Sequence, residues 1–214
     1  MSRRPFDCIL FDLDGTLVDS LADIASAVND LRSELGLCPV GLSEVRAAIG
    51  DGAWALLRRT LPEGTYGPQH LERFLVHYDR RLLEQTRPYP GVEALLTALA
   101  DCRLALITNK PLALTRRLLD GLGLKDRFAL VLGAESCLEK KPHPAPLLHA
   151  MERLGASSER TLMVGDHHTD LLAGRAACVR TCFCTWGLGE RGEAFFDYRA
   201  DSPAELQRLL AGKP

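Results

Sequence analysis

Four groups of polar residues with different chemistry follow four predicted strands of this chain of 214 residues. The groups are Asp12 and Asp14, Thr108 with Asn109, Lys140 with Lys141, and Asp166 with Asp170 one helical turn later. Carboxylates gathered at one place repel one another unless a cation joins them, and oxygen ligands suit Mg²⁺, which leaves room for a substrate phosphate. Lys141 and the hydroxyl of Thr108 could then hold the anionic group that the metal attracts. These residue types alone indicate magnesium-assisted phosphoryl transfer.

The elements that must position these groups alternate along the chain. Apolar runs predict strands over residues 6–13, 104–107, 128–132, 161–164 and 179–185, and helical spacing predicts helices over residues 92–100, 111–122, 145–154 and 169–177. Alternating strands and helices predict an α/β core with a Rossmann-like parallel sheet that is covered on both faces. Open sheets of this kind bind ligands at the carboxyl ends of their strands, so we expect the four polar groups at one edge.

A helical segment separates the first strand from the rest of the sheet. Across residues 20–83 apolar side chains recur at helical spacing, and no strand-like run interrupts them. We therefore predict a core domain of residues 1–17 and 88–214, with an all-helical domain of residues 18–87 inserted into it. Gly50-Asp51-Gly52 interrupts two helices of this insert, where backbone amides could bind an anion, although a plain turn explains the sequence equally well.

The composition restricts the class of partner and the compartment. Lys and Arg number 26 against 28 Asp and Glu, a net charge of -2, so the chain has no overall attraction for nucleic acid or anionic membranes. It holds no apolar run of about 18 residues, the length of a membrane helix, and its first residues lack the pattern of a signal peptide. Seven scattered cysteines without a Cys-x-x-Cys pair favour a reducing, cytoplasmic location. Monomer and homodimer both stay open.

Four motifs, in order, resemble those of the haloacid dehalogenase superfamily. They are Asp12-Leu13-Asp14-Gly15-Thr16, Ile107-Thr108-Asn109-Lys110, Lys141-Pro142-His143-Pro144 and Val164-Gly165-Asp166-His167-His168-Thr169-Asp170. The resemblance covers essentially the whole chain, and both Thr185-Trp186-Gly187 and the helical insert are similar to the phosphoglycolate phosphatase branch, which carries a small helical cap. Each motif alone is moderately specific, whereas the ordered set is strongly so.

The resemblance implies a role for each acidic residue. Asp12 would be the nucleophile that forms an aspartyl-phosphate, and Asp14 would protonate the leaving alkoxide and then activate water. Asp12, the main-chain carbonyl of Asp14 and Asp166 would hold Mg²⁺. Asp170 would orient the lysine or a metal-bound water from outside the ligand set, and Thr16 would help to fix the turn.

The same resemblance implies which residues bind the substrate. Thr108 and Lys141 would take part in catalysis as well as binding, because they would stabilise the negative charge of the transferring phosphoryl group. The expected substrate-binding residues are Thr108, Asn109, Lys141, Gly50 and Gly52. A small-molecule phosphate ester is therefore the expected partner.

The aspartate at position 14 discriminates between activities within the superfamily. A dehalogenase releases halide, which needs no proton, and its relatives lack an aspartate at that position. Cation-pumping ATPases carry a similar turn but need membrane helices. The resemblance thus favours a magnesium-dependent phosphatase for a small, phosphoglycolate-like monoester. A phosphomutase of the β-phosphoglucomutase type and a non-catalytic phosphoryl sensor are the alternatives.

The sequence departs from the family pattern in the fourth motif and in the cap. His167-His168 stands where a small polar residue is common, and we favour a capping or solvated role, because Mg²⁺ prefers oxygen to imidazole. Asp51 would disfavour a substrate carboxylate unless it points away or forms a hydrogen bond. Arg46 or Arg58-Arg59 could supply the missing positive charge, and Lys110 could either approach the substrate or lie on the surface.

Overall fold

A computed structural model describes residues 4–211, so the predicted domain limits at residues 1 and 214 lie outside the described residues. In this range the core holds a six-stranded sheet in which all neighbouring strands are parallel. In spatial order its strands are β5 (Leu130–Leu132), β4 (Arg103–Ile107), β1 (Cys8–Phe11), β6 (Thr161–Gly165), β7 (Arg180–Cys184) and β8 (Tyr198–Ala200). The chain's first strand thus lies in the middle of the sheet, which explains why its residues are buried on both faces.

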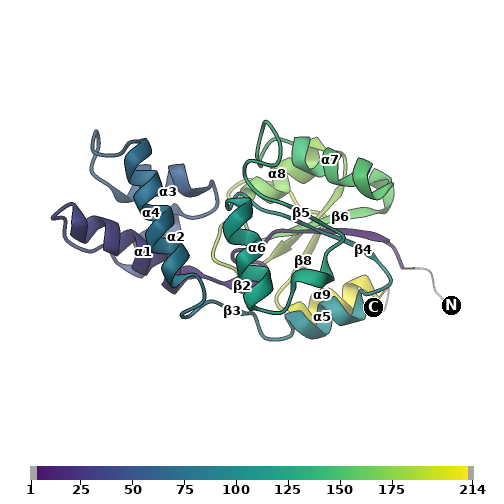
Figure 1. The fold of residues 1–214 in the computed structure, drawn as a ribbon. Coiled ribbons are helices and arrows are strands. Elements are labelled where there is room, and N and C mark those ends of the chain that lie inside the picture. Colours follow the sequence, from purple (N-terminus) through teal and green to yellow (C-terminus); the bar gives the residue numbers. More distant parts are fainter. Residues whose placement is uncertain (1–3, 212–214) are drawn as a thin grey trace.

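Helices cover both faces of this sheet (Figure 1). One face carries α5 (Val92–Ala98), α6 (Leu112–Gly121) and α9 (Pro203–Leu210), and the other carries α7 (Ala145–Leu154) and α8 (His168–Ala176). Short 3₁₀ turns occupy Lys125–Arg127 and Ser158–Arg160. The helical spacing of Leu147, Ala150 and Met151 gives α7 one apolar face, and all three belong to the cluster that packs on the sheet. The predicted α/β architecture is confirmed.

The insert forms a separate group of helices beside the core (Figure 1). It consists of α1 (Leu21–Glu34), α2 (Leu42–Ala48), α3 (Ala53–Thr60) and α4 (Pro68–Arg81). The chain enters and leaves through a two-stranded antiparallel ribbon of β2 (Val18–Asp19) and β3 (Arg87–Pro88), in which Val18 pairs with Pro88. The all-helical cap is therefore present, and its exact limits at residues 18 and 87 stay a prediction.

Two elements near the carboxyl terminus, β8 and α9, are absent from the sequence prediction. A three-residue strand at the edge of the sheet is too short to show an alternating pattern. For α9 a signal exists, because Ser202 accepts a hydrogen bond from the amide of Glu205 at 3.2 Å and Pro203 opens the helix. Ser-x-x-Glu with proline in the first turn is a recognised helix start.

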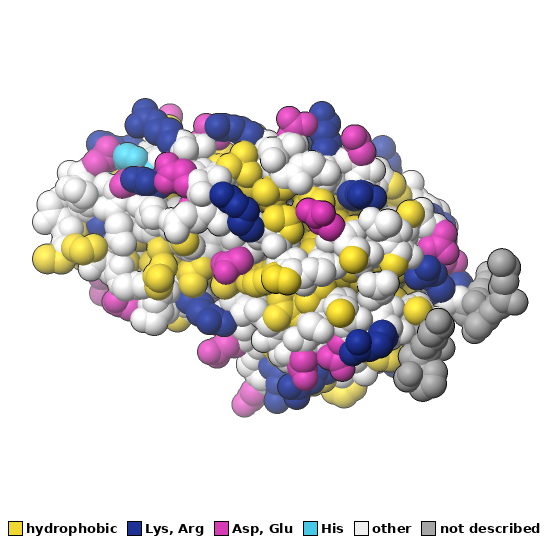
Figure 2. All heavy atoms as spheres, turned by 90° about the horizontal axis from the view of Figure 1, so that it is seen from below, with side chains coloured by type: hydrophobic (Ala, Val, Ile, Leu, Met, Phe, Trp, Pro, Cys, Tyr) yellow, Lys and Arg dark blue, Asp and Glu magenta, His cyan; other side chains and the backbone are white. Residues whose placement is uncertain are grey.

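The surface carries charges of both signs. Figure 2 shows acidic and basic side chains interspersed over the lower face, with hydrophobic side chains between them, in keeping with the net charge of -2. Within residues 4–211, no helix combines the length and the apolar character that crossing a membrane requires.

Candidate active site

Lys141 joins the ends of several core elements. Its ammonium nitrogen donates hydrogen bonds to Oδ1 of Asp12 and to Oδ1 of Asp170, both at 2.7 Å, and to the carbonyl of Ile107 at 2.5 Å. The Lys141 side chain is only 2% exposed. Lys141 precedes α7, Asp12 follows β1 and Asp170 lies in α8, so the expected meeting at the carboxyl ends of the strands is confirmed.

Asp12, Asp166 and Asp170 form a buried carboxylate cluster, in which one oxygen of each lies within 4.8 Å of the others. Burial raises the pKa of Asp12 well above its usual value, with Asp170 and Asp166 adding to the shift and Lys141 opposing it. Burial and the charge of Asp170 raise the pKa of Asp166 to about 6. The charged forms are therefore costly on their own, which is the condition that a divalent cation relieves.

Asp166 is held in place by several donors. The hydroxyl of Thr16 donates to its Oδ1 at 2.9 Å, and the amides of Leu188 and Gly189 donate to its Oδ2 at 2.9 and 2.7 Å. Gly15 must be a glycine here, because its φ is +88° and a Cβ would lie 2.1 Å from Asp166 Oδ2. Thr16 thus contacts an expected metal ligand directly.

Asp170 uses both of its oxygens within the protein. Oδ1 accepts from Lys141, and Oδ2 accepts from the amide of His167 at 3.1 Å. These bonds suit a residue that orients the lysine better than one that binds a metal. Asp12 and Asp166 line the cavity described below, whereas Asp170 does not, so Asp12 and Asp166 are the side chains that fit Mg²⁺, a hard cation that takes one or two carboxylates and keeps other positions open.

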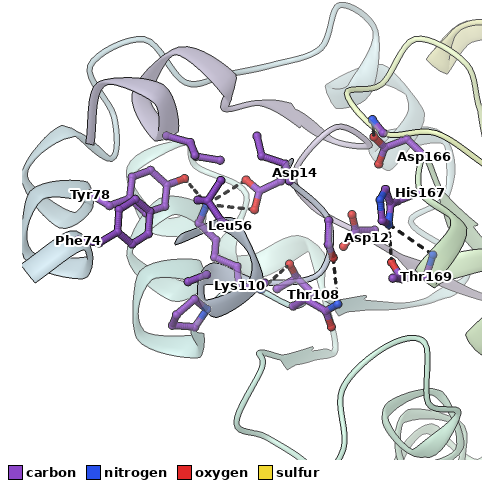
Figure 3. A pocket seen from close by; sticks show the side chains of 18 of the residues that line it. Asp12, Asp14, Leu56, Phe74, Tyr78, Thr108, Lys110, Asp166, His167 and Thr169 are labelled. Carbon is purple, nitrogen blue, oxygen red and sulfur yellow. Dashed lines mark hydrogen bonds and ion pairs between the residues drawn. The ribbon is translucent and has the colours of Figure 1, made fainter. Parts of the chain in front are cut away.

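Asp14 faces away from this cluster, toward the cap. The hydroxyl of Ser20 donates to its Oδ1 at 2.6 Å, and Lys110 donates to Oδ1 at 2.9 Å and to Oδ2 at 3.1 Å. Figure 3 shows Asp14 beside Lys110 and Tyr78, whereas Asp12 lies on the side of Asp166. The two aspartates of the first motif therefore occupy two different environments.

Lys110 is a site residue whose position the sequence left open. Its side chain is 3% exposed, and its ammonium group also donates to the hydroxyl of Tyr78 and lies 4.4 Å from the centre of that ring. Tyr78 belongs to α4 of the cap, and burial raises its pKa well above the usual value. The sequence signal for Lys110 is its position directly after Thr108-Asn109 at the end of a strand, the edge at which open parallel sheets bind ligands.

Thr108 and Asn109 lie between the core cluster and the cap. Both are buried, and the Thr108 hydroxyl accepts from the amide of Lys110 at 3.2 Å. The Asn109 side chain donates to the carbonyls of Gly50 at 3.0 Å and Lys141 at 2.9 Å. Asn109 thus fixes the cap turn against the loop that carries Lys141, a contact that the motif alone does not reveal.

Gly50 and Gly52 face the core. Their φ values are +115° and +90°, and a Cβ would lie 2.4 Å from the His167 ring at Gly50 and 2.9 Å from Lys140 Nζ at Gly52. Lys140 Nζ donates to the carbonyl of Asp51 at 2.5 Å. Only glycine combines these left-handed conformations with so close an approach. The cap turn is therefore seated on the core.

Arg46, Arg59 and Asp51 of the cap are engaged with protein groups. Arg46 donates to the carbonyls of Leu188 at 3.0 Å and Gly187 at 2.7 Å. Arg59 donates to Oδ2 of Asp51 at 2.5 Å, which holds the pKa of Asp51 below its usual value despite partial burial. Asp51 is thus hydrogen-bonded, one of the two conditions expected for it. Neither arginine lines the cavity described below, so neither supplies the expected positive charge there.

His167 caps α8. Its Nδ1 lies 3.0 Å from the Thr169 hydroxyl and accepts from the amide of Thr169 at 3.4 Å. Burial, with a contribution from neighbouring His168, lowers the pKa of His167 to about 4, so the imidazole is neutral at pH 7. The favoured capping role agrees with these contacts.

Residues of the core and of the cap together line a cavity of about 70 Å³ (Figure 3). At 10–15 Å³ for each water, it has room for roughly five to seven. Its core side carries Asp12, Asp14, Thr108, Asn109, Lys110 and Asp166, and its cap side is mostly apolar, with Ile24, Ile49, Leu56, Phe74 and Leu75. The arrangement places three carboxylates, those of Asp12, Asp14 and Asp166, and one lysine around a space for a small molecule.

Comparison with known proteins defines the class. The sequence model of the haloacid dehalogenase-like hydrolase family matches residues 9–184, so the chain belongs to this family. It is 37% identical to the phosphoglycolate phosphatase of Aquifex aeolicus, over 94% of this chain and 95% of that protein. It is also 37% identical to the phosphoglycolate phosphatase of Chromobacterium violaceum, over 98% and 99%.

A solved structure agrees with these relatives. The crystal structure of a predicted phosphoglycolate phosphatase from Haemophilus somnus superposes with a TM-score of 0.89 at 30% identity, covering 96% of this chain and 98% of that one. Together with the relatives, this likeness makes the chain a phosphatase of the haloacid dehalogenase type.

Proposed function

We propose that this chain is a Mg²⁺-dependent phosphatase that hydrolyses a small organic phosphate monoester through an aspartyl-phosphate on Asp12, with phosphoglycolate as the first candidate substrate. The observation that carries the proposal is the pair of 2.7 Å contacts from Lys141 to Asp12 and Asp170 within the buried carboxylate cluster. A phosphate at this edge meets a nucleophilic carboxylate and a fixed positive charge.

The first step forms a bond between a carboxylate oxygen of Asp12 and phosphorus, and the ester P–O bond breaks. Asp14 gives its proton to the leaving alkoxide, acting from the cap side of the cavity. In the second step Asp14 takes a proton from water, whose oxygen attacks phosphorus. The bond to Asp12 breaks, inorganic phosphate leaves and both aspartates return to their starting states. Thr108 and the Asn109 amide would bind the phosphoryl oxygens.

The metal fits the residues at the bottom of the cavity. Asp12 and Asp166, with the main-chain carbonyl of Asp14, would hold it. When bound, Mg²⁺ neutralises charge on the phosphoryl oxygens and on the clustered carboxylates. The raised pKa values of Asp12 and Asp166 support this assignment, because they express the cost of burying these carboxylates and of their mutual repulsion, which the cation would offset.

The cavity supports a small leaving group with one anionic end. Among the described residues, its lining combines an apolar cap side with a single cation, which suits a small leaving group better than a large polar one. Among residues 4–211, Lys110 is the one lysine or arginine in the lining, 2.9 Å from Asp14. A substrate carboxylate could share this ammonium group. The phosphoglycolate phosphatases among the relatives support the same choice.

A substrate panel tests the proposal. Phosphate release from phosphoglycolate, sugar phosphates, nucleotides and an aryl phosphate is measured with Mg²⁺ and after chelation, and kcat/KM is ranked. We expect hydrolysis that needs Mg²⁺, is lost in Asp12→Asn and is fastest with small anionic esters. Turnover that survives chelation or Asp12→Asn would contradict the mechanism. A phosphorylated isomer formed without free phosphate would identify a mutase instead. Cytoplasmic location and monomer or homodimer state stay predictions.

A further inference from the structure

Two histidines and an aspartate meet at the boundary between cap and core, beside the catalytic cavity. Asp51 lies in the cap turn, and His167 and His168 open α8 of the core. One potential ligand atom of each lies within 4.8 Å of the other two. The Asp51 Oδ1 to His168 Nε2 distance is 3.9 Å, and the two imidazole centres are 4.1 Å apart. The mechanism proposed above uses none of these three side chains.

Existing contacts orient the three groups toward a common point. The Nδ1 of His167 contacts the Thr169 hydroxyl, and the opposite edge of the ring faces the cap turn, since a Cβ on Gly50 would lie 2.5 Å from Nε2. Arg59 holds Oδ2 of Asp51, which leaves Oδ1 toward His168. To bind a metal through Nε2, His167 must carry its proton on Nδ1, which then donates to the Thr169 hydroxyl instead of accepting from the Thr169 amide. Metal-binding histidines are commonly oriented by such a hydrogen bond donated from the other ring nitrogen.

The ligand set differs in chemistry from the carboxylate cluster. Imidazole suits Zn²⁺, Ni²⁺ and Cu²⁺, whereas Mg²⁺ prefers oxygen. Three atoms no more than 4.8 Å apart all lie within about 2.8 Å of a common point, against about 2.0–2.1 Å for a zinc–nitrogen bond. Side-chain movements below about 1 Å would therefore complete the site. Two cations lie nearby, Arg59 and Lys140, and both are already engaged, by Asp51 Oδ2 and by the Asp51 carbonyl.

We propose that Asp51, His167 and His168 bind one transition-metal ion of the Zn²⁺ type, separately from the magnesium site, and that this ion ties the cap to the core. A water would complete four-coordination. Asp51 belongs to the cap and the two histidines belong to the core, so the ion would hold the cap against the core. If the proposed phosphatase function is right, substrate entry and product release need the cap to open, and the ion would slow turnover.

Calorimetric titration with Zn²⁺ in saturating Mg²⁺ tests the binding directly. We expect the wild-type protein to show one binding event that weakens at least tenfold in His168→Ala and in Asp51→Asn, because even residues outside the ligand set change metal affinity by about 10–100-fold. His149→Ala, in α7, is the matched control and should bind as the wild type does. Visible d–d bands on Co²⁺ addition, absent in His168→Ala, would support the same ligand set.

Turnover provides the second readout. In saturating Mg²⁺, Zn²⁺ should inhibit the wild type at concentrations at least tenfold lower than those that inhibit His168→Ala. Equal Zn²⁺ binding by wild type and His168→Ala would overturn the proposed site, and equal inhibition despite lost binding would overturn the link to the cap. A chain without phosphatase activity would still give the calorimetric result, so failure of the proposed function is recognised separately.

Discussion

The two ends of the central strand β1 carry one aspartate each, in opposite electrostatic surroundings. At its start, Asp7 accepts from Arg103 and from Arg160, both at 2.8 Å, and these bonds lower its pKa. At its end, burial raises the pKa of Asp12, and Asp170 and Asp166 add to the rise. The first aspartate is stabilised as an anion, whereas the second is kept where its charge is costly.

The two ends of β1 therefore differ in what their aspartates contribute: the contacts of Asp7 link strands, whereas Asp12 belongs to the candidate active site. Arg103 opens β4 and Arg160 directly precedes β6, so Asp7 ties together the amino ends of three neighbouring strands. At the carboxyl ends, the clustered carboxylates have one fixed cation, Lys141, and two of them, Asp12 and Asp166, line the cavity. Groups poised in this way are typical of active sites, because unpaired charge is what a substrate or metal then satisfies.

The strongest test of this comparison is Asp12→Asn. An amide is no nucleophile for phosphorus, so we expect phosphate release to fall at least about a thousandfold. The midpoint of denaturant unfolding should stay equal or rise, because the change relieves repulsion among the clustered carboxylates while Lys141 stays paired with Asp170. Rates of phosphate release and urea unfolding curves measure the two effects. Wild-type hydrolysis by this variant would show that Asp12 has no covalent role.

Lys141→Met, at the same carboxyl end of the sheet, should lower both the stability of the fold and the rate of turnover. Asp12 and Asp170 would lose their shared buried cation, so we expect a loss of about 3–5 kcal/mol in unfolding free energy. Turnover should fall by about 10²–10³ because the transferring group loses its fixed charge. The control is Lys125→Met, an exposed lysine, which should stay within about 0.5 kcal/mol.

The double variant Lys141→Met with Asp170→Asn separates the causes of that loss. Removing the second carboxylate should recover part of the stability without recovering turnover, since the lysine would still be missing. Unfolding free energies of the four proteins in this cycle give the coupling. No recovery would mean that the lysine contributes packing rather than charge compensation.

A smaller effect is expected at the cap side, from Lys110→Met. This change removes both bonds to Asp14 and the contact with Tyr78, while Ser20 still holds Asp14. We expect kcat to fall about 10–100-fold, less than the full contribution of general acid–base catalysis, with partial rescue in Lys110→Arg. Steady-state kinetics with an aryl phosphate measure this. A rise in KM alone would instead indicate a role only in substrate binding.

The sequence predicts which polar side chains meet at the carboxyl end of the sheet far better than which ones meet at the amino end. Asp12, Thr108, Lys141 and Asp166 each follow an apolar run, and the rule for parallel sheets brings them to one edge without knowledge of the strand order. The contacts of Asp7 depend on which strands neighbour β1 and in what register, here Cys8 opposite Arg103 and Thr161. Local patterns contain no information about that register.

The contacts between the cap and the core could not be predicted from the sequence either, for a related reason. Lys110 and Tyr78 are 32 residues apart, and their contact exists because α4 returns over the core edge. A lysine before a proline reads as a surface residue until the cap is placed above it. The helical spacing of the insert predicts that helices form, while their seating on the core depends on contacts such as Arg46 with the carbonyls of Gly187 and Leu188.

The smallest expected effect belongs to Asp7→Asn, the counterpart of Asp12→Asn. Activity should stay within about twofold, because the site lies at the other end of the strand. The Asp7 side chain is 35% exposed, so solvent screens its ion pairs and we expect a loss of only about 1 kcal/mol in unfolding free energy at pH 7. This loss should shrink at high salt. A large drop in activity would mean that the two ends of β1 are coupled.

The pH dependence of the loss in unfolding free energy caused by Asp7→Asn tests whether Asp7 stabilises the fold through its charge. Arg160 and Arg103 hold the pKa of folded Asp7 below its ordinary value of 3.8, so the folded state releases the proton more readily than the unfolded state. The stabilisation is therefore fully present above about pH 5 and disappears as the pH falls through the folded pKa. Urea unfolding of wild type and Asp7→Asn at several pH values should give curves that differ at pH 7 and converge toward pH 3. A difference in unfolding free energy that persists unchanged to pH 3 would show that Asp7 stabilises the fold through hydrogen bonds that do not depend on its charge.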